Sequence, residues 1–365
     1  MKTINTNKIK DFLNKDITST KIDSRILSLF LKQLSLLIAS GIAFDESLRI
    51  IENQKIDKKL TTALHNINMD LSAGFSVYEA FLHNNKYFDP MFLAFIKSGD
   101  RSGKLAEILD ELSSYINEDS KNKAAMKAAL TYPIILLVVT IAIVTIITTF
   151  VLPTFATVFK ETGQSLPVMT RILLGIANFF DEYGLLVLII GACIIMSFLI
   201  MRKDNDFRFS SDRWMFLNLP FKKFRILKFE YQFTSLLYIL RTGDIDIIDS
   251  LIIISDSFNN LYLKDLLDEI ISDLSRGERL SVSLSSKPIF TPLFISMIKI
   301  GEDSGNMTDS LKKTSEYYAN DYVFRLKKMA QLAEPVTIII MSLLVGFVVF
   351  AIAIPIFDSV NSVTY

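Results

Sequence analysis

The sequence has very few of the residues that support disulfide or metal chemistry. Its 365 residues include one cysteine and two histidines. Cys193 cannot form an intrachain disulfide, and a thiolate-ligated metal site would lack ligands. His65 and His83 lie near amphipathic segments, where structural histidines are expected, and neither a GxxxxGK[ST] phosphate loop nor an HExxH motif occurs. With no nucleophile, base and orienting group visible together, the sequence predicts a protein that is not an enzyme and assigns it no cofactor. Whether it binds a metal ion stays open at this point.

The chain also lacks net charge, because 39 Lys and Arg residues balance 39 Asp and Glu residues. Binding of nucleic acid needs a basic excess gathered on one face, so no nucleic-acid partner is expected. Half of the residues are nevertheless hydrophobic, and the mean hydropathy is +0.37. Such a composition is too apolar for an ordinary soluble protein and favours a membrane protein.

The apolar excess is concentrated in three stretches without a charged residue, at 128–159, 183–201 and 335–357. Because about 20 apolar residues cross the hydrocarbon layer, we predict membrane-spanning helices at 128–152, 183–201 and 335–357. Their lack of ionisable side chains weighs against a pump, a secondary transporter or an intramembrane protease. Four threonine hydroxyls in the first span could hydrogen-bond to another helix or, more commonly, to the backbone of their own helix. These are Thr140, Thr145, Thr148 and Thr149.

Lysine and arginine gather on one flank of each span, before residue 128, after residue 201 and before residue 335. Because these residues favour the cytoplasmic side, the tail at 1–23 is expected in the cytosol. The loop at 153–182 and the tail at 358–365 are then expected outside. The first residues also lack the apolar core and the cleavage site of a secretory signal. The sequence thus predicts a multi-pass protein of the cytoplasmic membrane with a cytosolic N-terminus.

An internal repeat organises the rest of the chain. PMFLAFIKSGDRSGKL at 90–105 aligns without gaps on PLFISMIKIGEDSGNM at 292–307, and seven of the sixteen positions are identical. DLSAG at 70–74 matches DLSRG at 273–277, and SGIAFDESL at 40–48 matches TGDIDIIDSL at 242–251 with one inserted residue. Because both copies begin in the cytosol and leave through their own span, the span at 183–201 is needed to return the chain.

Each copy has the periodicity of helices rather than of strands. In SRILSLFLKQLSLLIASG the apolar residues form one stripe, Ser24 is a plausible N-cap, and Gly41 suits a left-handed C-cap. We therefore predict an all-α integral membrane protein with two homologous, antiparallel cytosolic helical bundles, at 24–127 and 202–330, and three transmembrane helices.

The GDRSG and GEDSG segments are predicted to join two helices in each bundle. We expect Gly99 or Gly301 to end one helix in the left-handed region, and Ser102 or Ser304 to cap the next helix through its hydroxyl. Turn geometry does not explain the acidic residue of each segment, so a contact with a partner or a cation and plain solvation remain equal alternatives. The residues of the two segments fall into two groups: candidate contacts (Asp100, Ser102, Glu302 and Ser304) and structural turn residues (Gly99, Gly103, Gly301 and Gly305).

The order bundle, span, outer loop, span, bundle, span, with a G-[DE]-x-S-G-x-[LM] motif in each bundle, resembles the inner-membrane platform proteins of type IV pili and type II secretion systems. PTFATVFKETGQSLPVMT after the first span resembles the outer loop of that family at Pro153, Phe155, Phe159, Leu166, Pro167 and Thr170. The resemblance runs from about residue 25 to residue 357. This sequence departs from the family pattern at the inserted residue of the second copy and at Met307, where the motif has leucine.

The resemblance implies a non-enzymatic role in assembly in the bacterial inner membrane. Its expected partners are a hexameric cytosolic ATPase, pilins or pseudopilins, other inner-membrane assembly proteins, membrane lipid and further copies of the chain. A protein of this kind couples the ATPase to the insertion of subunits into the base of a filament. The alternative from a different class is a membrane scaffold or receptor that binds cytosolic helices without a motor, with a transporter as a more distant third.

Overall fold

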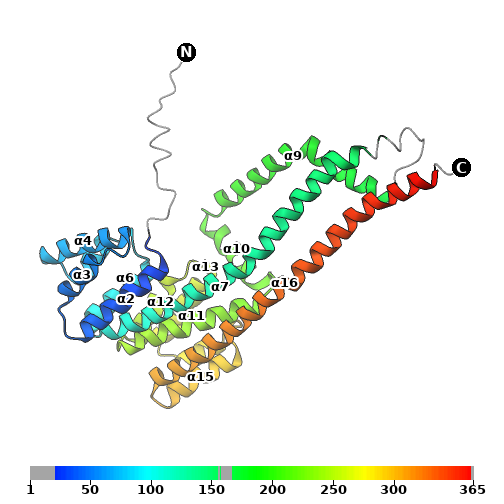
Figure 1. Cartoon of the computed structure of the whole chain (residues 1–365). Coiled ribbons are helices and arrows are strands. Elements are labelled where there is room, and N and C mark those ends of the chain that lie inside the picture. The colour runs from blue at the N-terminus through cyan, green and yellow to red at the C-terminus, as the bar shows by residue number, and fades with distance from the viewer. Residues whose placement is uncertain (1–20, 155–156, 158–166, 363–365) are drawn as a thin grey trace. The chain divides into compact units, whose positions relative to one another are not determined.

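The computed structural model describes residues 21–154, 157 and 167–362, and it is built from helices (Figure 1). Within these residues no strand is present, so the predicted all-α fold is confirmed. The chain divides into two compact units: unit 1 contains Met1–Asn122 and Phe209–Val323, and unit 2 contains Lys123–Arg208 and Phe324–Tyr365. Three parts of the sequence interpretation lie outside the described residues: positions 1–20, positions 363–365, and Phe155, Phe159 and Leu166 of the outer-loop pattern.

Unit 1 contains the same helices twice. The first copy is α2 (Ser24–Ala39), α3 (Phe44–Asn53), α4 (Lys58–Ser72), α5 (Val77–His83), α6 (Pro90–Ser102) and the start of α7 (Leu105–Ile146). After α10 (Asn205–Asn218), the second copy is α11 (Lys222–Thr242), α12 (Ile247–Ser257), α13 (Leu261–Ser275), α14 (Leu280–Ser285), α15 (Pro292–Asp303) and the start of α16 (Met307–Ser362). This correspondence of order confirms the internal repeat.

The two copies use matching positions for their cores. Phe30 of α2 and Phe233 of α11 are both fully buried, as are Phe92 of α6 and Phe294 of α15. Large apolar side chains at these positions remove the most surface from water, at about 25 cal/mol per Å² of apolar area. The shared pattern of burial follows from the same helical periodicity in each copy.

Two local predictions for the start of each copy need correction. Asp23, not Ser24, is the N-cap of α2, because its carboxylate accepts the backbone N–H of Arg25 at 2.8 Å. Gly41 does adopt the predicted left-handed conformation, with φ of 83°. Its equivalent is Asp244, with φ of 55°, because each follows the last helical residue by two positions. The sequence match of Gly41 with Gly243, and the inserted residue placed there, are therefore wrong.

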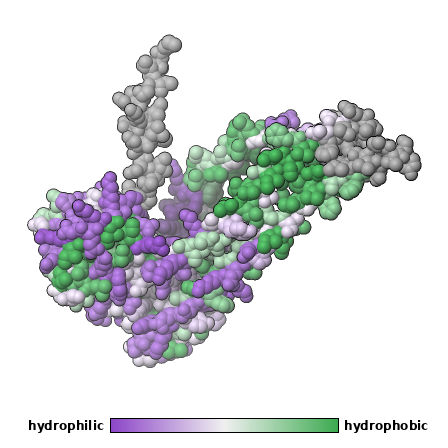
Figure 2. Space-filling view, in the orientation of Figure 1, coloured by the Kyte–Doolittle hydropathy of each residue, from purple (hydrophilic) through white to green (hydrophobic). Residues whose placement is uncertain are grey.

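Among the described residues, three helices are long and apolar enough to cross a membrane, which confirms the predicted number of spans, and their apolar stretches lie in unit 2. They are α7 with the π-helical segment η1 (Ile147–Val151), α9 (Val168–Met201) and α16. Their apolar side chains are largely exposed, and Figure 2 shows them as a continuous hydrophobic surface. Both α7 and α16 continue from unit 1 into unit 2 without a break, and α7 continues through Pro133.

Three of the four threonines named in the first span bond their own helix. The hydroxyls of Thr140, Thr145 and Thr148 donate to carbonyls four residues earlier, at 2.7–2.8 Å. A hydrogen bond between two helices of unit 2 comes from a different residue, since the buried hydroxyl of Thr170 in α9 donates to the carbonyl of Ala351 in α16 at 2.6 Å. This contact fixes α9 beside α16.

Candidate partner-binding site

The two motif segments form the same turn, but its left-handed residue is not the one expected. The helices α6 and α15 continue past Gly99 and Gly301, and the positive φ angles belong to Gly103 (70°) and Gly305 (68°). The prediction for Gly99 and Gly301 is therefore wrong in its geometry. A residue other than glycine in the left-handed region costs about 1–2 kcal/mol, which explains glycine at the end of each motif.

Gly99 and Gly301 have a packing role instead. Both are buried, and a Cβ atom on Gly99 would lie 2.6 Å from Cδ1 of Leu105, while one on Gly301 would lie 2.8 Å from Cβ of Ser310. The absence of a side chain lets the first turn of α7 approach α6, and that of α16 approach α15. Each motif thus has one glycine for close packing and one for backbone conformation.

The motif serines close the turns. Ser102 Oγ accepts the backbone N–H of Lys104 at 3.4 Å, and Ser304 Oγ accepts that of Asn306 at the same distance. Both residues are exposed. These N–H groups precede α7 and α16, so the prediction that the serines cap the following helix is wrong. At α16 the cap comes from Asn306, whose Oδ1 accepts the backbone N–H of Asp309 at 3.3 Å.

The two motif carboxylates differ sharply. Asp100 is exposed, and its side chain makes no hydrogen bond or ion pair with the described part of the chain. The side chain of Glu302 is only 12% exposed, accepts the backbone N–H of Ser281 at 3.2 Å, and lies 3.8 Å from Nε of Arg279. Asp100 thus keeps the predicted accessibility, whereas Glu302 is a structural cap of α14.

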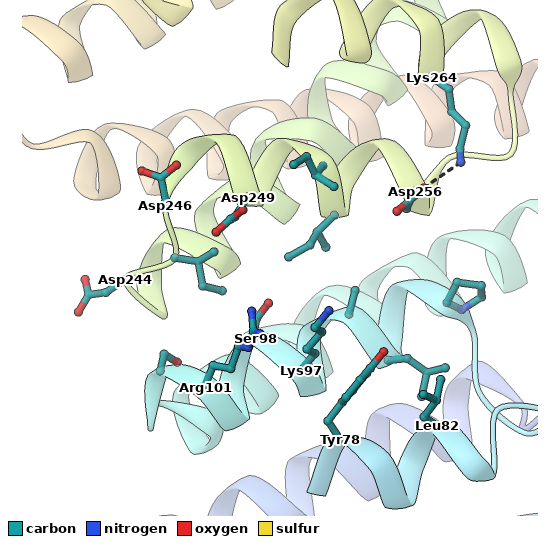
Figure 3. Close-up of a pocket in the computed structure, with 17 residues that line it drawn as sticks. Tyr78, Leu82, Lys97, Ser98, Arg101, Asp244, Asp246, Asp249, Asp256 and Lys264 are labelled. Atoms are coloured by element: carbon teal, nitrogen blue, oxygen red, sulfur yellow. Dashed lines mark hydrogen bonds and ion pairs between the residues drawn. The ribbon is translucent and has the colours of Figure 1, made fainter. Parts of the chain in front are cut away.

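A cleft lies beside the GDRSG motif, between α5 and α6 of the first copy and α12 of the second (Figure 3). Its volume is about 810 Å³, and its apolar lining includes Leu93 and Ile252. The motif contributes Arg101 and Ser102 to the wall, while Asp100 is not among the lining residues. The α12 wall could not be predicted, because no sequence pattern shows which helix of one copy packs on the other.

Basic and acidic side chains lie on opposite walls at the motif end of the cleft, and at its other end Lys264 pairs with Asp256 at 3.1 Å. Lys97 and Arg101 of α6 are exposed, and Figure 3 shows them across from Asp246 and Asp249 at the start of α12. The Lys97 ammonium lies 5.3 Å from the centre of the Tyr78 ring. The cleft can therefore accept a segment that carries acidic groups on one side and basic groups on the other.

The two copies are joined at the edge of this cleft. Lys104, directly after the GDRSG motif, pairs with Asp244 at 2.5 Å. The pairing raises the pKa of Lys104 and lowers the pKa of Asp244. Gly243 lies so close to α7 that a Cβ atom there would be 2.4 Å from Cδ1 of Ile108. The first motif and the α11–α12 turn therefore form one surface.

One buried carboxylate stands apart from the cleft. Glu230 of α11 is 1% exposed and takes the place of Leu27 in the first copy. It accepts the backbone N–H of Thr291 at 2.6 Å, and the Thr291 hydroxyl bonds the Tyr318 hydroxyl at 2.9 Å. Burial raises the pKa of Glu230 to about 7, although the bonds from Thr291 oppose the shift.

No group of three or more His, Cys, Asp or Glu side chains able to hold a metal occurs in the described ranges.

Comparison with known proteins identifies the repeat. Residues 30–153 and 233–355 each match the model of the family described as type II secretion system (T2SS), protein F. Together these segments cover more than half of the chain. The chain belongs to the type II secretion system protein F family. Each matched segment includes one motif and the span that follows it.

Relatives within the protein F family carry names from two machines. The type IV pilus assembly protein PilC of Pseudomonas aeruginosa is 26% identical over 345 residues, which cover 94% of this chain and 92% of the relative. PilC of Thermus thermophilus is 24% identical, over 93% of this chain and 83% of the relative. The type II secretion system protein F of Pseudomonas aeruginosa is 26% identical, over 92% and 83%. The family resemblance and the multi-pass membrane architecture are thus confirmed.

Proposed function

We propose that this protein is an inner-membrane platform that couples a hexameric cytosolic ATPase to the insertion of pilin or pseudopilin subunits into a filament base. The names of its relatives in type IV pilus assembly and type II secretion support this role. The observation that carries the proposal is that each motif stands at the start of an unbroken helix that ends as a span.

This continuity supplies a route for mechanical coupling. The helix α7 begins two residues after Gly103, and α16 begins two residues after Gly305. From Leu105 to the start of the first uncharged stretch, α7 is roughly 35 Å long at 1.5 Å per residue. A force applied at a motif turn therefore acts on a helix that continues into the membrane, although Pro133 in α7 and Pro335 in α16 lack the backbone N–H of the usual helical hydrogen bond.

The cleft is the proposed contact for the ATPase. Its occupant is a partner segment that places carboxylates near Lys97 and Arg101, and basic side chains near Asp246 and Asp249. Ser102 at the rim adds an exposed hydroxyl. Asp100 lies outside the cleft lining and belongs to the adjoining exposed surface of the same motif.

The proposed orientation follows the distribution of basic residues. Unit 1 lies in the cytosol, where the ATPase is, and the C-terminus is extracytoplasmic. The segment at 153–182, expected as the outer loop, also lies outside, and its residues from Val168 onward form the first part of α9. The uncharged spans pack against apolar pilin helices and membrane lipid. Further copies of the chain and other inner-membrane assembly proteins complete the proposed assembly.

A charge reversal in the repeated segment, two residues before each motif, tests whether the cleft binds the ATPase. Lys97 and Lys299 are equivalent and both exposed, but Lys97 alone of the two lines the cleft. We expect Lys97→Glu to reduce co-purification of the ATPase with the tagged full-length chain and to reduce filament number. Lys299→Glu, at equal protein level, is expected to leave both unchanged. Equal ATPase recovery with both variants would remove the cleft from the proposal.

A further inference from the structure

The last part of α10 and the turn that joins it to α11 present large apolar side chains to solvent. Trp214 is 57% exposed, and Phe221, which adopts a left-handed backbone conformation with φ of 68°, is 65% exposed. Positive φ is rare for a bulky aromatic residue and costs about 1–3 kcal/mol. The fold therefore maintains a strained backbone that holds Phe221 outside the core.

Arg225 stabilises this strained turn. Its guanidinium donates hydrogen bonds to three backbone carbonyls, those of Phe216 at 3.1 Å, Leu219 at 2.7 Å and Pro220 at 2.6 Å. A planar guanidinium with all its bonds on the backbone holds the turn in one shape. The exposed aromatic side chain is thus presented by a built structure.

The same segment is strongly basic. From Arg213 to Phe229 there are five Lys or Arg residues and no Asp or Glu. Arg213, Lys222 and Lys223 are exposed next to Trp214 and Phe221. Exposed aromatics beside several bases form the composition that the anionic interface of a membrane attracts, through apolar insertion and through the charge of its headgroups.

The course of the chain also indicates that this segment lies near the membrane. Trp214 follows Met201, the last residue of the membrane helix α9, by 13 positions. Within unit 1, Phe224 of α11 stacks on Tyr322 of α16 at 5.3 Å between ring centres, which is where α16 leaves the unit. The start of α16's uncharged stretch at Pro335 is about 20 Å further along the helix. The turn therefore lies at the end of unit 1 from which the chain enters its span.

We propose that the turn from Trp214 to Lys223 is a contact for the anionic surface of the cytoplasmic leaflet. Trp214 and Phe221 insert among the headgroups, and Lys222 and Lys223 bind lipid phosphates. The contact would restrain unit 1 at the bilayer while a partner acts on its motif turns. The cytoplasmic location rests on the proposed orientation, but the lipid contact itself does not require the ATPase.

Trp214 is the only tryptophan of the chain and therefore reports its own environment. The full-length protein is reconstituted into vesicles of phosphatidylethanolamine and phosphatidylglycerol, with bromine atoms placed at shallow or deep acyl positions. We expect a blue-shifted Trp214 emission that shallow bromines quench more strongly than deep ones. Because both leaflets have the same lipids, the result is independent of the orientation of the protein and of filament assembly.

Two variants separate the parts of the contact. Phe221→Gly relieves the left-handed strain while removing the aromatic ring, so we expect a folded protein with weaker quenching by bromolipids. Lys222→Gln with Lys223→Gln is expected to abolish the difference between anionic vesicles and vesicles of phosphatidylcholine. The matched control is Lys58→Gln with Lys59→Gln, the lysine pair that begins α4, and it should retain the wild-type signal.

The proposal is overturned if Trp214 in the anionic vesicles has the emission of a water-exposed indole, is quenched by aqueous iodide and is insensitive to bromolipids. The same result is expected if a protein partner, rather than lipid, covers the turn. It is also overturned if the lysine pair at 222–223 and the control pair at 58–59 change the signal equally. Retention of helical circular dichroism in each variant shows that loss of signal does not come from unfolding.

Discussion

The carboxylate of Glu302 accepts the backbone N–H of Ser281 at 3.2 Å, so a side chain of α15 caps the first turn of α14. In the first copy the equivalent helix is α5, and its free backbone N–H groups are capped by its own residues, because Ser76 and Glu79 form a capping box there. Asp100, at the position equivalent to Glu302, has no helix to cap and remains exposed. One repeated carboxylate is therefore structural in one copy and accessible in the other.

This difference predicts opposite responses to the same substitution. Glu302→Ala should lower the free energy of unfolding by about 1 kcal/mol through loss of a cap. Asp100→Ala should change it by less than about 0.5 kcal/mol, as is usual for exposed residues. Thermal unfolding of the full-length chain in detergent, followed by circular dichroism, measures both. Equal destabilisation by the two substitutions would contradict the structural assignment of Glu302.

The two glycines of the second motif should also respond differently. Gly305→Ala strains a left-handed residue with open space around it and should cost about 1–2 kcal/mol, and Gly305→Asn should cost less because asparagine tolerates this conformation. At Gly301 the obstacle is the Ser310 side chain, so asparagine should be worse than alanine there. Chemical denaturation of the four variants gives the two orders. The same order at both positions would show that one cause acts at both.

The sequence predicted the features that depend on periodicity along one chain. The uncharged stretches located three spans, and the matched motifs located two copies of a helical unit. The predictions that failed concern residues whose role depends on contacts between helices. Nothing local distinguishes Gly99, which packs on Leu105, from Gly103, which takes the left-handed conformation. The cleft wall on α12 and the cap formed by Glu302 likewise depend on which helices meet in space.

Glu230 should make stability depend on pH. Its folded pKa of about 7 lies above the ordinary value of 4.5, so the folded state holds the proton more tightly than the unfolded state. The stabilisation is complete below about pH 4.5 and is lost as pH rises to about 7. The shift corresponds to about 3 kcal/mol at most. Glu230→Gln should retain an acceptor for the Thr291 N–H and remove this dependence.

Unfolding of wild type and Glu230→Gln across pH 4.5–8 tests this expectation. The difference in free energy of unfolding between them should grow with pH up to about 7 and then stay constant. Leu27→Met, at the equivalent core position of the first copy, is the control and should leave the pH profile of wild type unchanged. A difference between wild type and Glu230→Gln that does not vary with pH would mean that Glu230 has the same pKa in both states.

The last prediction concerns the packing of α9 against α16. Thr170 is fully buried and joins α9 to the carbonyl of Ala351 in α16, whereas Thr145 bonds only the carbonyl of Ile141 in its own helix. Thr170→Val keeps the shape of the side chain but removes the donor, and hydrogen bonds between membrane helices average about 0.6 kcal/mol. We expect a loss of about that size for Thr170→Val, recovery with Thr170→Ser, and a smaller effect for Thr145→Val. Unfolding by SDS in mixed micelles measures the four proteins under one condition. If Thr145→Val destabilises as much as Thr170→Val, the hydroxyls act within single helices and the contact with Ala351 does not hold α9 against α16.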